Sequence, residues 1–321
     1  SVLVSYLKQN YQDSQIIGFD SEIYKNCLTS EKDPESFLDK QIVGDVRNFD
    51  ESILDKVDAI VYLSAISNDP MSNAFKKLTL DVNFFSCIKI AKLAKKHKVK
   101  RFIFASSCSI YGSNQGYAKK EKDGLDPLTT YAKSKIESEK QLEILSDEDF
   151  KVMCLRFATA CGSSPRLRLD LALNDFVASA FVNKKIILLS DGSSWRPFIS
   201  VKDMCRAIAW VIYGLNFDNF LSVNIGSNHW NFQIKDLAKK TSKILNNILY
   251  EIGKGKVRDK RSYKVNFDKF NLMAKGYLPE EKLENTIREM HATLEKINFN
   301  IKDFRRSDLI RLVVLKRYLN K

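Results

Sequence analysis

The chain has 321 residues, 44% of them hydrophobic, and a formal net charge of +13 at pH 7. This length can bury one large core or two connected cores, so a globular protein is expected. No stretch approaches the roughly 18 to 20 apolar residues that a membrane-spanning helix needs, and no signal peptide is recognisable. We therefore expect a cytoplasmic protein that does not contact membranes.

The cysteines and histidines argue against disulfides and metal. The six cysteines form no Cys-x-x-Cys pair and mostly lie in apolar runs, as reduced, buried thiols of a cytosolic protein do. The three histidines, His97, His229 and His291, lack the spacing of metal ligands. We expect no metal site.

The positive charge raises the possibility of nucleic-acid binding. However, lysine outnumbers arginine by 38 to 14, and sites that read phosphates and bases favour the arginine fork. Lysines spread over solvated helix faces explain the charge equally well, and a positive field also suits a small anionic substrate. We expect no dedicated nucleic-acid site.

Short apolar segments of strand length alternate with helical patterns through the first half of the chain. The predicted strands are residues 15–20, 40–46, 58–65, 100–107 and 150–159. Between the last three strands, apolar residues recur every three or four positions in two segments that we predict as helices, 72–97 and 129–145. Strands that are apolar throughout and separated by helices predict a parallel sheet covered on both faces. The fold class is therefore α/β, with a doubly wound parallel (Rossmann) sheet.

The second half is less regular. It contains three predicted helices and two predicted strands, at 174–185, 201–215, 234–248, 186–190 and 221–227. We predict a dinucleotide-binding Rossmann domain over residues 1–160. A smaller α/β substrate-binding domain would cover residues 161–321, with some of its segments returning to the first domain.

The start of the chain departs from the dinucleotide-binding pattern. Residues 1–10 form an amphipathic helix, and the strand that follows ends in Asp20. In a dinucleotide fold such an acid follows a first strand, a glycine-rich turn and a first helix. Here the helix is present, but the first strand and the glycine-rich loop are not. We expect about a dozen further residues upstream in the working protein, because losing a central strand would leave an exposed slot in the sheet.

Acids and small residues follow the early strands, where a parallel sheet binds its ligands. The Asp20 carboxylate is placed to accept both ribose hydroxyls of adenosine, and its charge would repel a 2′-phosphate, which favours NAD over NADP. Asp45 follows the next strand and is placed to bind the adenine amino group. The small Ser64 and Ala65 allow a cofactor to approach the backbone closely. A turn or cap role for Asp20 is an equally common alternative.

A hydroxyl, a tyrosine and a lysine could converge at the same sheet edge. The strand over 100–107 ends in Ser106 and Ser107, and a helix beginning near Thr129 carries Tyr131 and, one turn later, Lys135. Tyr250 and Lys254 repeat the Tyr-x-x-x-Lys spacing, which chance alone explains. No serine-bearing strand precedes that second match. We therefore assign catalysis to Ser107, Tyr131 and Lys135.

The lysine matters because free tyrosine has a pKa near 10, which leaves about one phenolate in a thousand at pH 7. A neighbouring ammonium and a cationic nicotinamide ring should lower the pKa of Tyr131, and a shift of about three units corresponds to roughly 4 kcal/mol. Such a phenolate can accept the proton of a sugar hydroxyl while hydride leaves for the nicotinamide. Ser107 would hold the same oxygen.

Taken in order, several motifs resemble the extended short-chain dehydrogenase/reductases, and more narrowly the NAD-dependent epimerase/dehydratase family acting on nucleotide sugars. The motifs are SSCSIYG, TTYAKSK, LRFATACG, SSWRPFISVKD and DKRSYKVNFDK. The resemblance covers nearly the whole chain. The combination of SSCSIYG with YAKSK is far more specific than either motif alone.

The resemblance implies roles for individual residues. Ser107, Tyr131 and Lys135 match the catalytic trio, and Lys135 also holds the nicotinamide ribose. The positions that match contacts to NAD are Asp20, Asp45, Val46, Leu63, Ser64, Ala65, Asn83, Tyr131 and Lys135. The positions that match contacts to the substrate are Ser107, Thr159, Asn174, Arg196 and Arg258. Asn174 and Arg196 correspond to groups on the diphosphate, which a guanidinium suits through paired hydrogen bonds. The further basic contact comes from Lys256, Arg258 or Arg261, of which we assign Arg258.

Departures from the family pattern refine the function. Dehydratases of the family carry Asp-Glu directly after the catalytic hydroxyl, and this chain has Cys108 and Ser109 there, so water elimination is disfavoured. Because water elimination is disfavoured, we expect an NAD-dependent nucleotide-sugar epimerase, acting at carbon 4 through a transient keto sugar. Thr159 stands where many 4-epimerases carry an asparagine, so the resemblance does not define the sugar-facing pocket.

Alternatives remain open within the same motifs. A nucleotide-sugar 4-keto reductase or a dehydratase shares them, and a non-catalytic dinucleotide-binding or RNA-binding member of the fold would share the sheet. The helical segments 72–98 and 127–146 match the pair that forms a four-helix dimer interface in the family, so we expect a homodimer. The basic C-terminal segment FRRSDLIRLVVLKRYLNK is expected to be a packing element.

Overall fold

The computed structural model describes residues 1–113, 116–214, 216–252 and 259–320. Its largest sheet has four parallel strands in the order β3-β4-β5-β9. The strands are β3 (Ala59–Tyr62), β4 (Arg101–Ser107), β5 (Lys151–Phe157) and β9 (Phe220–Ile225). Strands β4 and β5 are buried along most of their length, as expected for a parallel sheet covered on both faces.

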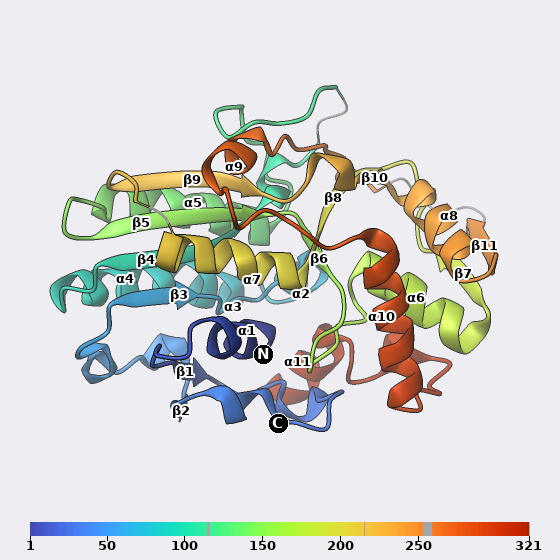
Figure 1. Cartoon of the computed structure of the whole chain (residues 1–321), viewed down its shortest axis with the longest axis horizontal. Helices are drawn as coiled ribbons and strands as arrows, with labels where there is room; N and C mark the ends of the chain where they lie inside the picture. The colour runs from blue at the N-terminus through green and yellow to red at the C-terminus, as the bar shows by residue number, and fades with distance from the viewer. Residues whose placement is uncertain (114–115, 215, 253–258, 321) are drawn as a thin grey trace.

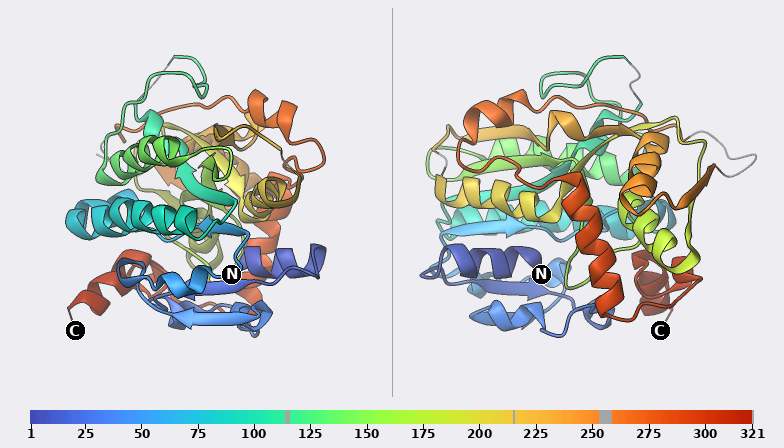
Figure 2. Two further views of the ribbon diagram at one scale, coloured as in Figure 1. Left: turned by 90° about the vertical axis from the view of Figure 1, so that its left-hand side faces the viewer. Right: turned by 45° about the vertical axis from the view of Figure 1, so that its right-hand side comes forward.

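Helices cover the two faces of this sheet (Figures 1 and 2). On one face lie α4 (Ser86–Lys96) and α5 (Thr130–Leu145), and on the other lies α7 (Val201–Ala209). Helix α5 begins where it does because Thr129 caps it, its hydroxyl accepting a hydrogen bond from the Ala132 N–H at 3.2 Å. This cap places Tyr131 in the first turn, at the carboxyl edge of the sheet.

The first two strands form a separate sheet. Strand β1 (Ile17–Asp20) pairs in parallel with β2 (Lys40–Val43), and helix α1 (Val2–Asn10) precedes them. Within the described residues, β1 pairs only with β2 and β3 pairs only with β4, so the strand order is interrupted between β1 and β3. The chain passes from β1 outward to β2 and from β3 outward to β4, so the order of strands reverses at this interruption (Figure 1). Such a reversal is the ligand-binding position in open parallel sheets.

Most of the second half forms a module with its own core (Figure 1). The strands of this module form a three-stranded sheet in the order β10-β8-β6 and a two-stranded sheet of β11 and β7. They are β6 (Thr159–Cys161), β7 (Lys185–Leu188), β8 (Trp195–Ser200), β10 (Asn231–Gln233) and β11 (Leu249–Ile252). Its helices are α6 (Ala172–Asn183), α8 (Ile234–Ile244) and α10 (Leu283–Lys296). A domain boundary near residue 160 stays a prediction.

Short helices complete the described chain. They are α2 (Asp69–Ala74), α3 (Lys76–Leu80), α9 (Asp268–Met273) and α11 (Arg311–Leu319), with π-helical turns at η5 (Asp81–Phe85) and η7 (Trp210–Gly214). Within the described ranges, no helix combines the length and apolarity needed to span a lipid bilayer.

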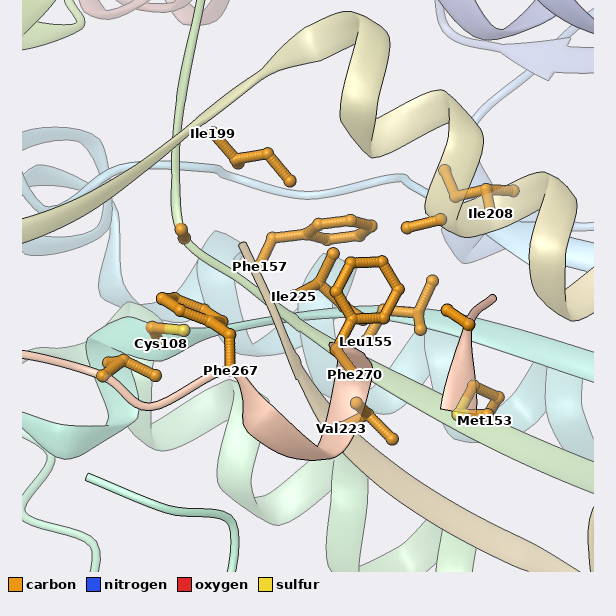
Figure 3. Packing of buried hydrophobic residues seen from close by; sticks show 14 of the residues in the cluster. Cys108, Met153, Leu155, Phe157, Ile199, Ile208, Val223, Ile225, Phe267 and Phe270 are labelled. Carbon is orange, nitrogen blue, oxygen red and sulfur yellow. The ribbon is translucent and has the colours of Figure 1, made fainter. Parts of the chain in front are cut away.

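Segments far apart in the sequence share the largest core. Figure 3 shows Phe157 of β5 packed with Ile208 of α7, Ile225 of β9, and Phe267 and Phe270 around the start of α9. Each fully buried phenylalanine contributes about 2 to 3 kcal/mol of burial free energy. This shared core attaches late segments of the chain to the largest sheet, which fixes their position relative to its strands.

Candidate active site

The structure brings Ser107 and Tyr131 together. Ser107 ends β4 and caps the 3-10 turn η6 (Cys108–Tyr111), its hydroxyl accepting a hydrogen bond from the Ser109 N–H at 3.2 Å. A hydrogen bond joins the side chains of Ser107 and Tyr131. A strand-end hydroxyl and a first-turn tyrosine therefore meet at the carboxyl edge, the arrangement needed to bind one substrate oxygen between them.

Lys135 lies one turn further along α5 and is 2% exposed. Its Nζ donates a hydrogen bond to the Ala105 carbonyl at 2.6 Å, and lies 4.5 Å from the ring centre of Phe104 and 5.6 Å from that of Tyr131. Burial lowers the pKa of Lys135 to about 8. The group is therefore largely an ammonium at pH 7, directed toward the backbone of β4 and the face of the tyrosine ring.

The pKa of Tyr131 differs from the expectation. Burial raises the pKa to about 12, while the hydrogen bond with Ser107 and the charge of Arg168 lower it and the charge of Asp69 raises it. A lowered pKa was expected from the Lys135 ammonium together with a cationic nicotinamide ring, but this ammonium donates to the Ala105 carbonyl and lies over the ring face of Tyr131. In this state the phenol is protonated at pH 7.

A chain of ion pairs lies beside the tyrosine. Asp69, the first residue of α2, accepts a hydrogen bond from the Thr129 hydroxyl at 2.7 Å and pairs with Arg261. Arg261 also bonds to Asp259 at 2.8 Å, and Asp259 accepts from Arg196 at 2.8 Å. These contacts connect the start of α5, the helix that carries Tyr131, to β8. Sequence reasoning missed Asp69, since nothing in its local pattern marks it.

Of the two assigned substrate arginines, Arg196 lies in this chain of ion pairs. It is 8% exposed, and one of its nitrogens donates to the Trp195 carbonyl at 2.8 Å. A buried guanidinium held in this way is preorganised for an anion. Arg258 and Lys256 lie outside the described residues. Arg261, the third basic residue considered for this contact, is described, and it shares the Asp259 carboxylate with Arg196.

The predicted cofactor residues differ in solvent exposure and in the hydrogen bonds that their side chains already make. Asp20 is exposed at the end of β1, and within the described residues one of its oxygens accepts a hydrogen bond, from the Glu22 N–H at 2.6 Å. Asp45 is held by Arg47 at 2.6 Å, and this hydrogen bond lowers its pKa. The other positions that begin or follow turns at this edge are Val46, which is buried in the core, Leu63, which is 50% exposed, and the partly exposed Ser64 and Ala65.

Asn83 shapes the site from within. It lies in the π-helical turn η5 and has no exposed surface. Its amide oxygen accepts from the Ile66 N–H at 2.8 Å, and its amide nitrogen donates to the Ile66 carbonyl and the Ser134 hydroxyl, each at 3.2 Å. This side chain therefore ties the loop after β3 to helix α5, and its contact to the cofactor stays a prediction.

Asn174 likewise holds a loop. It is 2% exposed, and its amide oxygen accepts a hydrogen bond from the Gly162 N–H at 3.0 Å. Its amide nitrogen donates to the Gly162 carbonyl at 3.3 Å and to the Arg168 carbonyl at 2.9 Å. Its amide holds the loop after β6, and its contact to a diphosphate stays a prediction. Thr159 begins β6 and is partly exposed.

The second Tyr-x-x-x-Lys match lies elsewhere. Tyr250 is on strand β11 at the edge of the separate two-stranded sheet, where it pairs with Ile186 and is 37% exposed. Lys254 lies outside the described residues. The structure thus places Tyr250 away from the serine-bearing edge of the main sheet.

Sequence reasoning also missed a buried ion pair behind the site. Glu139 lies on the same face of α5 as Tyr131 and Lys135, at successive intervals of four residues. Two nitrogens of Arg156 on β5 donate to Glu139 at 2.7 to 3.1 Å, both side chains are 7% exposed, and Ser106 also donates to Glu139. An arginine in the middle of an apolar strand was the available signal, since a buried charge requires a partner.

Comparisons with known proteins show the family of the chain and its fold. A family model described as the NAD dependent epimerase/dehydratase family matches residues 1–226. The uncharacterized UDP-glucose epimerase YtcB of Bacillus subtilis is 29% identical over 164 residues, which cover 50% of this chain and 51% of that protein. A putative UDP-glucose 4-epimerase of Methanocaldococcus jannaschii is 23% identical over 281 residues, which cover 85% of this chain and 90% of that protein. The alignment thus spans about half the length of the first relative.

Among solved structures, a UDP-glucuronic acid 4-epimerase from Bacillus cereus in complex with UDP-glucuronic acid and NAD is similar, with a TM-score of 0.77 and 20% identity. The similarity covers 92% of this chain and 95% of that chain, and it confirms the predicted Rossmann-type α/β fold. Because the family model matches well over half of the residues, the chain belongs to the NAD-dependent epimerase/dehydratase family.

Proposed function

We propose that this protein is an NAD-dependent nucleotide-sugar epimerase that inverts carbon 4 through a transient keto sugar. The observation that carries the proposal is the convergence of Ser107, Tyr131 and Lys135 at the carboxyl edge of the main sheet. Relatives and similar structures with epimerase names support the reaction class.

The described residues fit a dinucleotide. The Lys135 ammonium has three N–H donors, and its hydrogen bond to Ala105 uses one, so donors remain for a ribose. One oxygen of Asp20 makes no hydrogen bond within the described residues, and it lies at the strand end that would hold the adenosine ribose. When bound, the nicotinamide supplies a hydride acceptor that can return the hydride to the other face of the sugar.

Proton transfer falls to Tyr131. A phenol with a pKa of about 12 must be brought toward neutrality before it can accept the proton of the sugar hydroxyl, and five units correspond to about 7 kcal/mol. A hydrogen bond from Ser107 and positive charge near the ring stabilise the phenolate, and both become stronger when a bound ligand excludes water. Lys135 contributes by holding position and charge against the ring.

We assign the substrate diphosphate to Arg196, with Arg261 and Arg258 as further basic contacts, and the sugar to Ser107 and Thr159. The hydroxyl of Ser109 is buried and has no hydrogen-bond partner in the part of the chain that is described, so it is available to a sugar hydroxyl. The thiol of Cys108 is buried, and burial raises its pKa well above the usual value. This neutral thiol cannot replace the acid of a dehydratase, which favours epimerisation over water elimination.

The test is turnover without added cofactor. Purified protein should interconvert UDP-glucuronic acid, UDP-glucose or UDP-N-acetylglucosamine with the corresponding 4-epimer, as measured by chromatography. Tyr131→Phe should lower kcat by at least about 100-fold, the usual contribution of a positioned acid or base, while the melting shift with UDP is retained. Tyr250→Phe is the matched control and should leave turnover unchanged. Wild-type turnover by the Tyr131→Phe variant would overturn the assignment, and a requirement for added NADH would favour the keto reductase.

We further propose a homodimer formed by α4 and α5. These helices carry exposed apolar side chains, including Phe85 before α4, which is 58% exposed, and Ile144 on α5, which is 74% exposed. A surface pocket between them is lined by apolar residues and lysines. We propose a cytoplasmic location because all six cysteines are free thiols, and we propose no nucleic-acid partner.

A further inference from the structure

The C-terminal helix α11 lies across the carboxyl ends of β1 and β3. Leu312 and Leu315 of α11 pack against Ile23 and Tyr24, which follow β1, and against Ile66, which follows β3. Figure 1 shows α11 close to α2, the helix that continues from β3. Since the strand order reverses between β1 and β3, this helix lies at the place where an open parallel sheet binds its ligand.

Arg311, the first residue of α11, brings to this edge a cation that forms no salt bridge within the described residues, although the Cys27 thiol and the charge of Asp170 lie near enough to raise its pKa. It is 6% exposed, and its guanidinium lies 4.5 Å from the ring centre of Tyr24. One terminal nitrogen, Nη2, donates to the Arg166 carbonyl at 3.1 Å, and the other, Nη1, is buried without a hydrogen-bond partner among the described residues. A buried, unpaired cation costs several kcal/mol, so its retention points to an anionic ligand.

Two neighbours extend the basic surface. The Tyr24 hydroxyl is also buried and without a hydrogen-bond partner in the described ranges. Arg168 is close enough to both Arg311 and Tyr131 for its charge to lower the pKa of each. It differs from Arg311 because Asp170 holds it with hydrogen bonds of 2.9 and 3.0 Å. Donors therefore run from the catalytic phenol, through Arg168, to Arg311 and Tyr24 beyond β1.

We propose that Arg311 of the C-terminal helix, together with the Tyr24 hydroxyl, binds the diphosphate of the dinucleotide. The inference rests on the proposed function, which places the nicotinamide end at Tyr131 and the adenosine ribose at Asp20. The diphosphate joins these two ends, and it carries the negative charge that the unpaired guanidinium lacks. Arg311 lies outside residues 1–226, which match the family, so this contact belongs to the chain's own C-terminal segment.

The diphosphate of the proposed substrate is the other source of phosphate groups. It fits Arg311 less well, because the cations assigned to it, Arg196 and Arg261, lie together on Asp259 beside the start of α5. Affinities for ADP and for UDP therefore separate the two sources.

The experiment compares Arg311→Met with Arg317→Met after removal of retained nucleotide. Arg317 lies on the same helix, has a side chain that is 58% exposed, and pairs with Asp308. We expect Arg311→Met to weaken binding of NADH, measured by fluorescence, and of ADP, measured by calorimetry, by about 10- to 100-fold, as for loss of a charged hydrogen bond. Affinities for adenosine and UDP should not change. Tyr24→Phe should weaken NADH and ADP binding by about 2- to 10-fold, and Arg317→Met should weaken neither.

The melting temperature of the ligand-free protein provides a second readout. Removing an unpaired buried charge should leave the melting temperature of Arg311→Met unchanged or higher, whereas a purely structural role would lower it and leave relative affinities intact. Equal loss of adenosine and ADP affinity, or wild-type NADH binding by both variants, would overturn the inference and leave the proposed function standing. If Arg311→Met does not fold, Tyr24→Phe decides. Absence of NADH binding by the wild type would remove both proposals.

Discussion

Replacing Arg156 with methionine should leave the Glu139 carboxylate as an uncompensated charge beneath helix α5. Both side chains are 7% exposed, and the pair is joined by hydrogen bonds of 2.7 and 3.1 Å. Removing one partner of such a buried pair typically costs about 3 to 5 kcal/mol. We expect Arg156→Met and Glu139→Met each to lose stability of this size.

The double variant distinguishes loss of the pair from loss of packing. With both charges replaced by methionine, no buried charge remains, so the double variant should be more stable than either single variant. The difference between the double variant and the sum of the singles measures the coupling between the two residues, which we expect to be several kcal/mol. The remaining cost reflects the hydrogen bonds from Ser106 and to Tyr111 that the pair also makes.

The assay is equilibrium unfolding in urea, supported by melting temperatures. At about 2.1 cal/mol/K per residue, a chain of 321 residues has an unfolding entropy of about 0.7 kcal/mol/K, so each single variant should melt about 4 to 7 °C lower. Glu137→Gln is the matched control on the same helix, because Glu137 pairs with Lys140 at 2.9 Å with both side chains more than half exposed. That exposed pair should contribute less than about 1 kcal/mol. Losses below about 1 kcal/mol in both single variants, or a double variant with the full sum of losses, would refute the reasoning.

Two further predictions concern Lys135 and the exposed face of α4 and α5. Because burial lowers the pKa of Lys135 to about 8 from 10.5, the folded protein binds fewer protons than the unfolded chain between these values, and stability should rise by up to about 3 kcal/mol from pH 8 to 10.5. Urea unfolding at several pH values should show this rise in the wild type and a smaller one in Lys135→Met, and parallel curves would contradict it. In sedimentation, the double variant Phe85→Lys/Ile144→Lys should be monomeric where the wild type is dimeric. Leu272→Lys, at a 75% exposed position on α9, is the control and should stay dimeric. A dimeric mass for the double variant would exclude this interface.

Local patterns were sufficient to predict the α/β fold and the grouping of Ser107, Tyr131 and Lys135. Apolar runs and helical spacing predicted a parallel α/β fold, which the structure and its similar proteins confirm. Ser107, Tyr131 and Lys135 were identifiable because a strand end and one helical turn fix their relative positions, and these are short-range features. The chance match at Tyr250 was separable for the same reason, since its surroundings lack the serine-bearing strand.

Contacts between distant segments could not be predicted in the same way. The sequence predicts Asn83 and Asn174 as ligand contacts, and only the structure shows that their amides also bond to loops of the protein itself. The raised pKa of Tyr131 depends on desolvation and on the charges of Asp69 and Arg168, which lie about 40 to 60 positions away in the sequence and are brought to the ring only by folding. The same holds for Arg311, whose local sequence reads as one more basic residue on an amphipathic helix. The sequence alone determined which helices and strands form and which side chains can react, because these properties follow from residues close together in the chain. The tertiary structure decided which charges are paired, because pairing and desolvation depend on distance in space.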